Sequence, residues 1–201
     1  MSLELVNTFG TLLTVAIIAA TATAAMVQLR HLRAGNQINA MLSIGNQFDA
    51  KEFRDALTLV QHNLDPALED PAYREYVMAR NRLMPLPAVA DEYREIAAAA
   101  RFVGNTYEEL GILVKNGIVD RDIFLDRYSW VILIAWSATK RSLAWTRAVT
   151  GNDSIWENFE YLTVLAQDFM RDRGSTYPKG VRRLELANPW SVPPIPATTQ
   201  A

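Results

Sequence analysis

Residues 88–116 read "AVADEYREIAAAARFVGNTYEELGILVKN", and this stretch decides the fold class. Its apolar side chains recur alternately four and three residues apart, which places them on one face of an α-helix. These positions are Val89, Tyr93, Ile96, Ala100, Val103, Tyr107, Leu110 and Val114. Phe102 and Leu113 widen the face, as in a helix of a globular bundle rather than a two-stranded coiled coil. We therefore expect a helix over about 88–116, the longest in the soluble part of the chain.

Two shorter helices are expected before this stretch. Residues 49–52 ("DAKE") are typical of a helix N-terminus, with an aspartate cap and a glutamate three residues later. The Asp-Pro pair at 65–66 is expected to end that helix. The second Asp-Pro pair, at 70–71, starts the next helix, because proline is favoured at the first helical position. That helix should end before the "MPLP" of residues 84–87.

Two further helices are expected after the long one. Asp120 is a cap for a helix over about 121–149, and Gly151 ends it. Residues 128–139, "YSWVILIAWSAT", carry no charge but are too few to cross a membrane, so we expect other helices to enclose them. Residues 154–157 form a capping box for a last helix, which ends near residue 174. No segment has the pattern of a strand, and we predict an all-α fold.

The N-terminal part contains a candidate transmembrane helix. Residues 5–29 carry no charge, and about 20 helical residues cross a hydrocarbon layer about 30 Å thick. Arg30 and Arg33 follow this segment, whereas Glu4 is the only charged residue before it. The positive-inside rule then places the N-terminus outside and the remainder of the chain in the cytoplasm. We expect a single-pass protein of a bacterial inner membrane.

The same segment has two alternative interpretations, a cleaved signal peptide and a buried helix of a soluble protein. Residues 20–25, "ATATAA", contain small-residue cleavage patterns, but a signal peptide needs positive charge before its apolar run. Cleavage would make the chain a secreted helical protein. Ala16, Ala20 and Ala24 also form a stripe of small residues that would let two such helices associate as a homodimer. We favour a chance origin for the stripe, because alanine-rich spans produce it readily.

These patterns divide the chain into five parts. They are a short N-terminal tail (1–8), a transmembrane helix (9–29), a juxtamembrane helical stalk (30–48), a helical bundle domain (49–174), and a proline-rich extended or disordered tail (175–201).

The composition argues against several function classes. Twenty Lys+Arg stand against 22 Asp+Glu in 201 residues, which leaves no basic excess for nucleic acid. Without cysteine there is no disulfide and no thiolate nucleophile or ligand, and two histidines without the Glu-x-x-His pattern do not make a di-iron site. Phosphate-binding loops and the hydrolase elbow are absent. We therefore expect no cofactor and no metal, and we lean against an enzyme.

A few polar and aromatic residues of the bundle are candidates for binding. Asn105 and Glu108 lie opposite the apolar face and are expected to be solvated, and Glu160 is expected to be buried against Arg141 or Arg147. The tryptophans are expected in the core. The complete set of binding candidates is Asn105, Glu108, Glu109, Trp136, Arg141, Glu157 and Glu160.

Three sequence features resemble a known family. They are "FVGNTYEELGILVKNGIVDRDIF" at 102–124, Trp136, and "WENFEYL" at 156–162. They are similar to a family of uncharacterised bacterial proteins, a domain of unknown function with an N-terminal membrane helix. The resemblance covers most of 9–174, implies the anchor and the helical domain, and implies no activity.

The leading functional hypothesis is an interaction or regulatory module at the inner face of the membrane. Its expected partners are the lipid bilayer and either a second copy or another protein. One alternative is a metal- or small-ligand-dependent enzyme that uses Glu108, Glu109 or Glu160. The other is the secreted helical protein.

Overall fold

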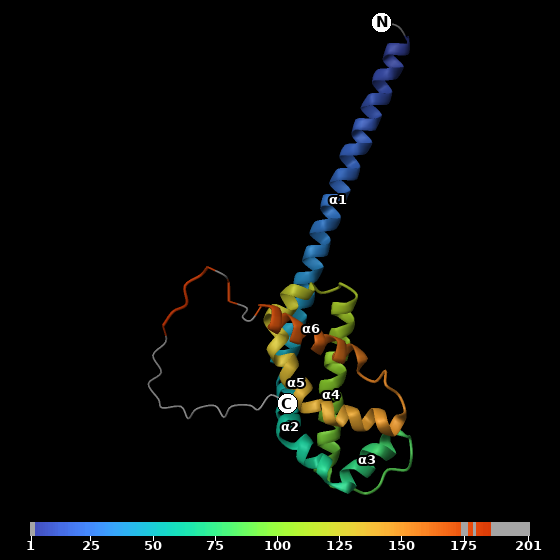
Figure 1. Ribbon diagram of the computed structural model, residues 1–201. Coiled ribbons are helices and arrows are strands. Elements are labelled where there is room, and N and C mark those ends of the chain that lie inside the picture. The colour runs from blue at the N-terminus through green and yellow to red at the C-terminus, as the bar shows by residue number, and fades with distance from the viewer. Residues whose placement is uncertain (1–2, 174–176, 179, 186–201) are drawn as a thin grey trace.

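The computed structural model describes residues 3–173, 177–178 and 180–185. Within them the chain forms six helices and no strand, which confirms the predicted all-α fold. The helices are α1 (Leu3–Asp49), α2 (Lys51–Glu69), α3 (Pro71–Asn81), α4 (Asp91–Lys115), α5 (Arg121–Thr150) and α6 (Glu157–Arg173). Figure 1 shows α1 projecting far out of a bundle made by the other five.

Helix α1 is one uninterrupted helix, and only its C-terminal end joins the bundle. It runs without a break through Gly35 and Gly45. Ile44 is buried, and the Phe48 ring packs 4.9 Å from the Tyr128 ring of α5. The predicted cap at Asp49 is wrong, because Asp49 still belongs to α1. A single extended residue, Ala50, separates α1 from α2 and makes no side-chain cap.

Helix α2 also differs from its predicted end. It continues through Pro66 to Glu69, whereas the Asp-Pro pair at 65–66 was expected to stop it. A proline inside a helix costs about 3 kcal/mol because it removes a backbone hydrogen bond and crowds the preceding turn. Ala67 and Leu68 lie beyond the proline and are both buried in the core. The burial of this last turn opposes the free-energy cost of the proline. Which residues are buried depends on the tertiary structure, so the sequence alone did not indicate it.

The predicted ends of α3 and α5 are confirmed. The Asp70 carboxylate accepts a hydrogen bond from the Ala72 backbone N–H at 2.7 Å, and the Asp120 carboxylate accepts two from the first turn of α5 at 3.0 Å. Gly151 ends α5 in the left-handed region, with φ 65°. These short-range contacts depend only on neighbouring residues, which is why the sequence indicates them.

The apolar face of α4 lies at the centre of the bundle, as its spacing predicts. Val103 and Tyr107 are fully buried, and Tyr107 stacks on Phe159 of α6 with the ring centroids 4.7 Å apart. Helix α4 begins at residue 91 rather than 88, because residues 82–90, with two prolines, form the connection from α3. With 25 residues it is shorter than α5, which has 30, so the expectation that it is the longest bundle helix was wrong.

Helix α5 is not enclosed on every side. Ile132 and Ala135 are fully buried, but Trp130 is 63% exposed. The expectation of complete enclosure was therefore wrong, and so was a core position for Trp130. The reason is geometric: α2, α3, α4 and α6 cover only part of the helix surface.

The predicted proline-rich tail lies mostly outside the described residues. Residues 177–178 and 180–185 are described and form neither helix nor strand. The Tyr177 hydroxyl donates to the Arg182 carbonyl at 3.0 Å. Residues 175–176, 179 and 186–201 lie outside the described part of the chain.

Candidate functional site

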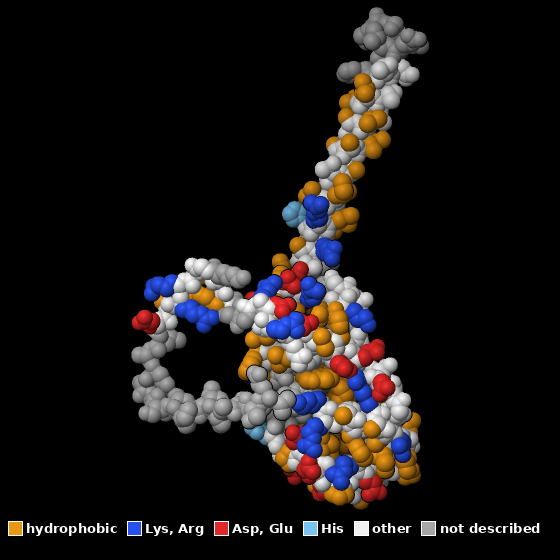
Figure 2. Space-filling view, viewed as in Figure 1, with side chains coloured by type: hydrophobic (Ala, Val, Ile, Leu, Met, Phe, Trp, Pro, Cys, Tyr) orange, Lys and Arg blue, Asp and Glu red, His pale blue; other side chains and the backbone are white. Residues whose placement is uncertain are grey.

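Residues 10–29 of α1 are mostly apolar, and every one of them is exposed. Helix α1 is long and apolar enough to cross a membrane, and none of its most apolar stretch is buried against the rest of the chain. Figure 2 shows hydrophobic side chains along the projecting helix and basic side chains closer to the bundle. Ala16, Ala20 and Ala24 are exposed on this helix, and their role in association stays a prediction.

The threonines of this segment have internal hydrogen-bond partners. The hydroxyls of Thr11, Thr14, Thr21 and Thr23 each donate to the backbone carbonyl four residues earlier, at 2.7–3.0 Å. In hydrocarbon no water is available, so each polar group needs a partner within the protein. These hydroxyls therefore fit the interior of a bilayer.

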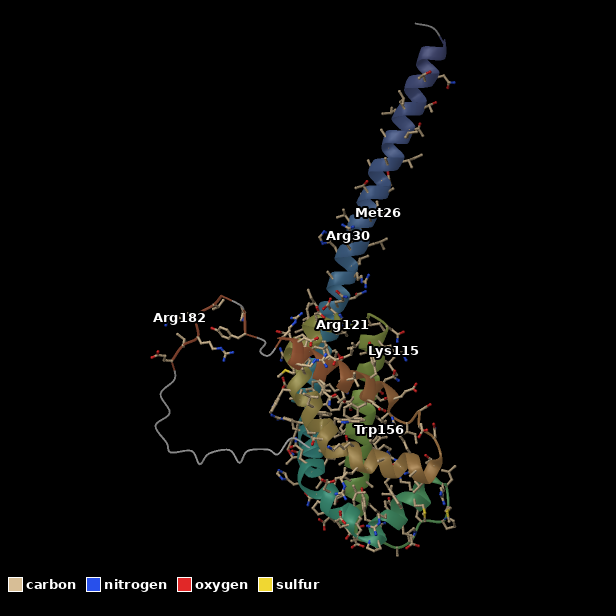
Figure 3. All side chains as sticks on the ribbon, viewed as in Figure 1. Met26, Arg30, Lys115, Arg121, Trp156 and Arg182 are labelled. Atoms are coloured by element: carbon tan, nitrogen blue, oxygen red, sulfur yellow. The ribbon has the colours of Figure 1, made fainter. Side chains whose placement is uncertain are left out.

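The end of the bundle from which α1 emerges carries charged side chains of both signs beside exposed apolar ones. Lys115 at the end of α4 and Arg121 at the start of α5 lie there (Figure 3). Ile118 and Ile123 beside them are more than half exposed. Arg121 pairs with Asp122 at 3.4 Å, so its charge is balanced locally. The exposed isoleucines are the feature of this end that suits contact with lipid.

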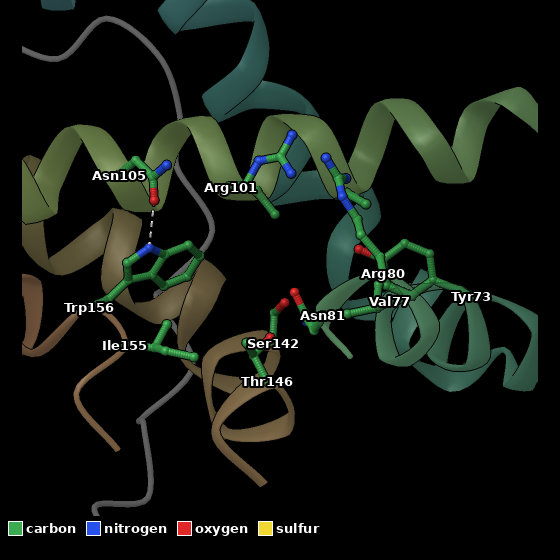
Figure 4. Close-up of a pocket in the computed structure, with 12 residues that line it drawn as sticks. Tyr73, Val77, Arg80, Asn81, Arg101, Asn105, Ser142, Thr146, Ile155 and Trp156 are labelled. Carbon is green, nitrogen blue, oxygen red and sulfur yellow. Dashed lines mark hydrogen bonds between the residues drawn. The ribbon is translucent and has the colours of Figure 1, made fainter. Parts of the chain in front are cut away.

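A pocket lies on the side of the bundle, between α3, α4, α5 and the connection from α5 to α6. Its volume is about 170 Å³. Arg80 and Arg101 lie side by side on one wall, and Trp156 and Ile155 lie on the other (Figure 4). The rest of its lining is made of small apolar and neutral polar side chains, and no lining residue is acidic.

The two arginines of the pocket lack acidic partners. Neither forms an ion pair with any carboxylate in the described part of the chain. Partial burial lowers the pKa of the Arg101 guanidinium, and the positive charge of Arg80 lowers it further. Both effects lower the pKa because no carboxylate beside Arg101 stabilises its cationic form. The pocket therefore has an uncompensated positive wall.

Tyr73 contributes a third polar group to the same pocket. Its side chain is fully buried, and its hydroxyl has no hydrogen-bond partner among the described residues. Burial raises the pKa of this hydroxyl, so it remains a protonated donor at neutral pH. Buried hydroxyls usually have a partner, and an orphan at a pocket wall indicates a place where a ligand or water accepts.

Trp156 is held in a defined position at the opposite wall. Its Nε1 donates to Oδ1 of Asn105 at 2.9 Å, which is the bond drawn in Figure 4. Its backbone φ of 54° lies in the left-handed region, which costs energy for a non-glycine residue. The indole fits against α4 only because residue 104 is glycine, since a Cβ there would overlap the indole ring. Asn105 is exposed, yet it is part of this packing.

The first turn of α6 is capped by α4. The Glu108 carboxylate accepts hydrogen bonds from the backbone N–H groups of Asn158 and Phe159, both at 2.9 Å. Close approach of the two helices needs Gly111, because a Cβ there would overlap the Asn158 carbonyl. Glu108 is half-buried rather than solvated, and it supplies the cap that was expected from Ser154.

The remaining candidates from the sequence lie apart from the pocket. Glu160 pairs at 2.7 Å with Arg147, which is one of the two arginines expected as its partner. About half of the Glu160 side chain is exposed, so the expected burial of this pair is only partial. Arg141 pairs with Asp65 and Glu69 of α2 instead. Trp136 packs edge-on against Phe159 in the core, while Glu109 and Glu157 are exposed.

Only Asn105 among the sequence candidates lines the pocket. Tyr73, Arg80 and Arg101 were missed, because no motif in the sequence connects α3 with α4. The one available signal was Arg101, a charge that directly follows the apolar run of residues 96–100. In the described residues no three His, Cys, Asp or Glu side chains come close enough to hold a metal ion.

The chain matches the model of one protein family. The model of a domain of unknown function, DUF4760, matches residues 13–164, more than half of the sequence. The chain belongs to this family. The DUF4760 match begins inside the apolar part of α1 and ends inside α6, so it includes the pocket and the α4–α6 junction. No curated protein and no solved structure matches the chain. The expected resemblance to a domain of unknown function is confirmed, and the apolar part of α1 is a candidate for the membrane helix that the resemblance implies.

Proposed function

We propose that this DUF4760 protein is a single-span protein of a bacterial inner membrane whose helical bundle is a cytoplasmic interaction or regulatory module. One observation carries the proposal: the apolar part of α1 is wholly exposed, and nothing in the described chain covers it. So much exposed apolar surface on one helix is costly in water and stable in hydrocarbon.

The position of the bundle relative to the span supports a role at the membrane surface. Arg30 and Arg33 mark the expected cytoplasmic edge of the bilayer. Ile44, which is buried in the bundle, lies about 21 Å further along the helix at 1.5 Å per residue. The headgroup layer is about 5–8 Å thick on each side, so Ile44 lies about 13–16 Å beyond it when the helix is perpendicular to the bilayer. The end from which α1 emerges, with the exposed Ile118 and Ile123, then faces the lipid.

Membrane fractionation tests the anchor. The chain should stay in the membrane pellet after washing with alkaline carbonate, which strips peripheral proteins. Release into the supernatant contradicts the anchor.

Single-cysteine labelling tests the orientation, because the natural chain has no cysteine. Two variants are compared in intact cells with a membrane-impermeant maleimide: Ser2→Cys, before the span, and Ser137→Cys, an exposed residue of α5. We expect labelling of Ser2→Cys alone, and labelling of both after lysis. Labelling of Ser137→Cys in intact cells overturns the cytoplasmic placement.

The same variants separate an anchor from a cleaved signal. N-terminal sequencing of the purified protein should begin at Met1 or Ser2. A start near Ala25 would show a secreted protein, and the cysteine at position 2 would then be lost from the mature chain.

A further inference from the structure

The pocket beside Trp156 combines features that solvated arginines alone do not explain. Its two guanidinium groups face one cavity that has no acidic lining residue, and the Tyr73 hydroxyl at the same cavity is buried without a partner. Like charges placed together and partly removed from water destabilise each other unless an anion joins them. Three unmatched hydrogen-bond donors on one wall are complementary to an oxyanion.

We propose that this pocket binds a small soluble organic anion, with its carboxylate or phosphate group between Arg80 and Arg101 and its apolar part against Trp156 and Ile155. The Tyr73 hydroxyl donates a further hydrogen bond to the oxyanion. Arginine suits this role because its planar fork of N–H donors matches carboxylate and phosphate oxygens.

The size of the pocket limits the ligand to a small molecule. A cavity of about 170 Å³ is slightly larger than the roughly 150 Å³ cavities that hold a benzene molecule. It is smaller than the roughly 300–1,000 Å³ pockets that hold drug-sized ligands. A single ring or short chain with one anionic group fills this volume, whereas most of a nucleotide or a peptide would extend out of the pocket into solvent.

The apolar wall of the pocket is already ordered in the free protein. Trp156 is fixed by its hydrogen bond to Asn105 and by its contact with Gly104, so binding does not have to order it. Trp156 also connects the pocket to the cap of α6, since it directly precedes the first turn that Glu108 holds. A ligand against Trp156 therefore contacts the junction of α4 and α6.

The location of the pocket favours a soluble anion over a lipid headgroup. Lys115 and Arg121 mark the bundle end near α1, and Trp156 lies on the side of the bundle, away from that end (Figure 3). A headgroup held in the membrane plane does not reach this side. The proposal is independent of which side of the membrane the bundle occupies.

Binding is tested with the full-length protein in non-ionic detergent micelles by isothermal titration calorimetry. The probes are benzoate and phenyl phosphate, with benzyl alcohol as the uncharged control. We expect saturable binding of at least one anion and none of the alcohol. Arg80→Gln or Arg101→Gln should weaken it by about ten- to a hundredfold, the usual range for a charge-assisted hydrogen bond. Arg94→Gln, an exposed arginine of α4 outside the pocket, is the matched control and should leave the affinity unchanged.

Tyr73→Phe separates a binding role from a structural one. Because the hydroxyl has no partner in the free protein, its removal should leave the melting temperature of the free protein equal or higher. The same change should weaken anion binding several-fold. Unchanged affinity in Tyr73→Phe overturns the role of this hydroxyl.

Two results of the calorimetry overturn the proposal, and a third comes from a lipid control. One is the absence of saturable binding of both anions to a protein whose circular dichroism shows an intact helical fold. The other is binding that Arg80→Gln and Arg101→Gln leave unaffected. The lipid alternative is tested in nanodiscs: affinity for the bound anion should be equal in phosphatidylcholine and phosphatidylserine discs. The comparison is made at an ionic strength that screens the surface charge of the discs, because an anionic membrane repels soluble anions. A loss in phosphatidylserine discs under these conditions would identify a headgroup as the occupant and overturn the soluble ligand.

Discussion

Glu108 of α4 and Asn158 of α6 are joined by two hydrogen bonds. Glu108 Oε2 accepts from the Asn158 backbone nitrogen at 2.9 Å, and Oε1 accepts from the Asn158 side-chain Nδ2 at 2.7 Å. The carboxylate also lies at the N-terminal end of α6, where the helix dipole favours negative charge. A residue fifty positions earlier in the chain thus supplies the cap of this helix.

Glu108→Ala should lower the free energy of unfolding by about 1–3 kcal/mol, because it leaves half-buried backbone N–H groups of α6 without an acceptor. Urea unfolding in micelles, followed by far-ultraviolet circular dichroism, measures the change. Glu109→Ala is the matched control, since this neighbouring glutamate is exposed, and it should change the free energy by less than about 0.5 kcal/mol. Equal effects of the two variants would contradict the capping role.

Gly104→Ala should lower the free energy of unfolding by about 1–3 kcal/mol, because the new Cβ overlaps the Trp156 indole and forces α4 and Trp156 apart. Gly35→Ala is the control within a helix: nothing lies within 4 Å of its new Cβ, so it should leave stability unchanged or raise it by up to about 1 kcal/mol. Thermal unfolding and tryptophan emission measure both variants. If Gly104→Ala were as stable as Gly35→Ala, the packing of Trp156 against α4 would be wrong.

Arg147→Ala should destabilise the fold by about 1.5–3 kcal/mol, because the guanidinium donates two hydrogen bonds to the Ile155 carbonyl and is only 19% exposed. Arg141→Ala should have a much smaller effect. The Arg141 side chain is 52% exposed, and surface ion pairs contribute little. Urea midpoints of the two variants test the contrast, which fails if Arg141→Ala is the more destabilising change.

The Tyr93 hydroxyl donates to the Asp70 carboxylate at 2.5 Å. This bond, followed by the Ala72 N–H, lowers the pKa of Asp70 below its usual range. A lowered acid pKa stabilises the fold above the unfolded-state value of about 3.9, and this contribution is lost as the pH falls through the folded-state value. Tyr93→Phe should therefore raise the pKa of Asp70. In this variant the stability should fall less steeply as the pH decreases, along the acid arm of the plot of stability against pH. Asp153→Asn, an exposed carboxylate, should leave that arm unchanged.

Nuclear magnetic resonance titration of the Asp70 carboxyl measures the pKa directly, and melting temperatures between pH 2 and 6 measure the stability profile. An Asp70 pKa that is the same in the natural chain and in Tyr93→Phe would contradict the role of this hydrogen bond.

The predictions from sequence that failed share one cause. Pro66 is followed by a further helical turn because Ala67 and Leu68 reach the core, and Asp49 does not cap α2 because α1 continues up to it. Cap and stop signals describe only the preferences of neighbouring residues, and burial of distant apolar surface outweighs them. Trp130 is exposed for a related reason: an uncharged run does not tell which face the neighbouring helices leave open.

The candidate site, like the helix ends, could be predicted only in part from the sequence. Asn105 and Glu108 were identified as polar groups opposite the apolar face of α4, but their partners, Trp156 and Asn158, lie about fifty residues away on another element. Arg80 and Arg101 meet because α3, which packs on α2 and α5, brings Arg80 to the pocket that α4 also lines, and nothing in their sequence neighbourhoods indicates it.

By itself, the sequence determined the all-α class, the apolar N-terminal helix, the buried face of α4 and the ends of α3 and α5. These follow from helical periodicity and from caps, which act over one or two turns. The tertiary structure alone decided that α4 caps α6, that Gly104 admits the Trp156 indole, and that two arginines share a cavity without an acid. Those relationships join residues far apart in the chain, and only the packing of whole helices brings them within hydrogen-bonding distance.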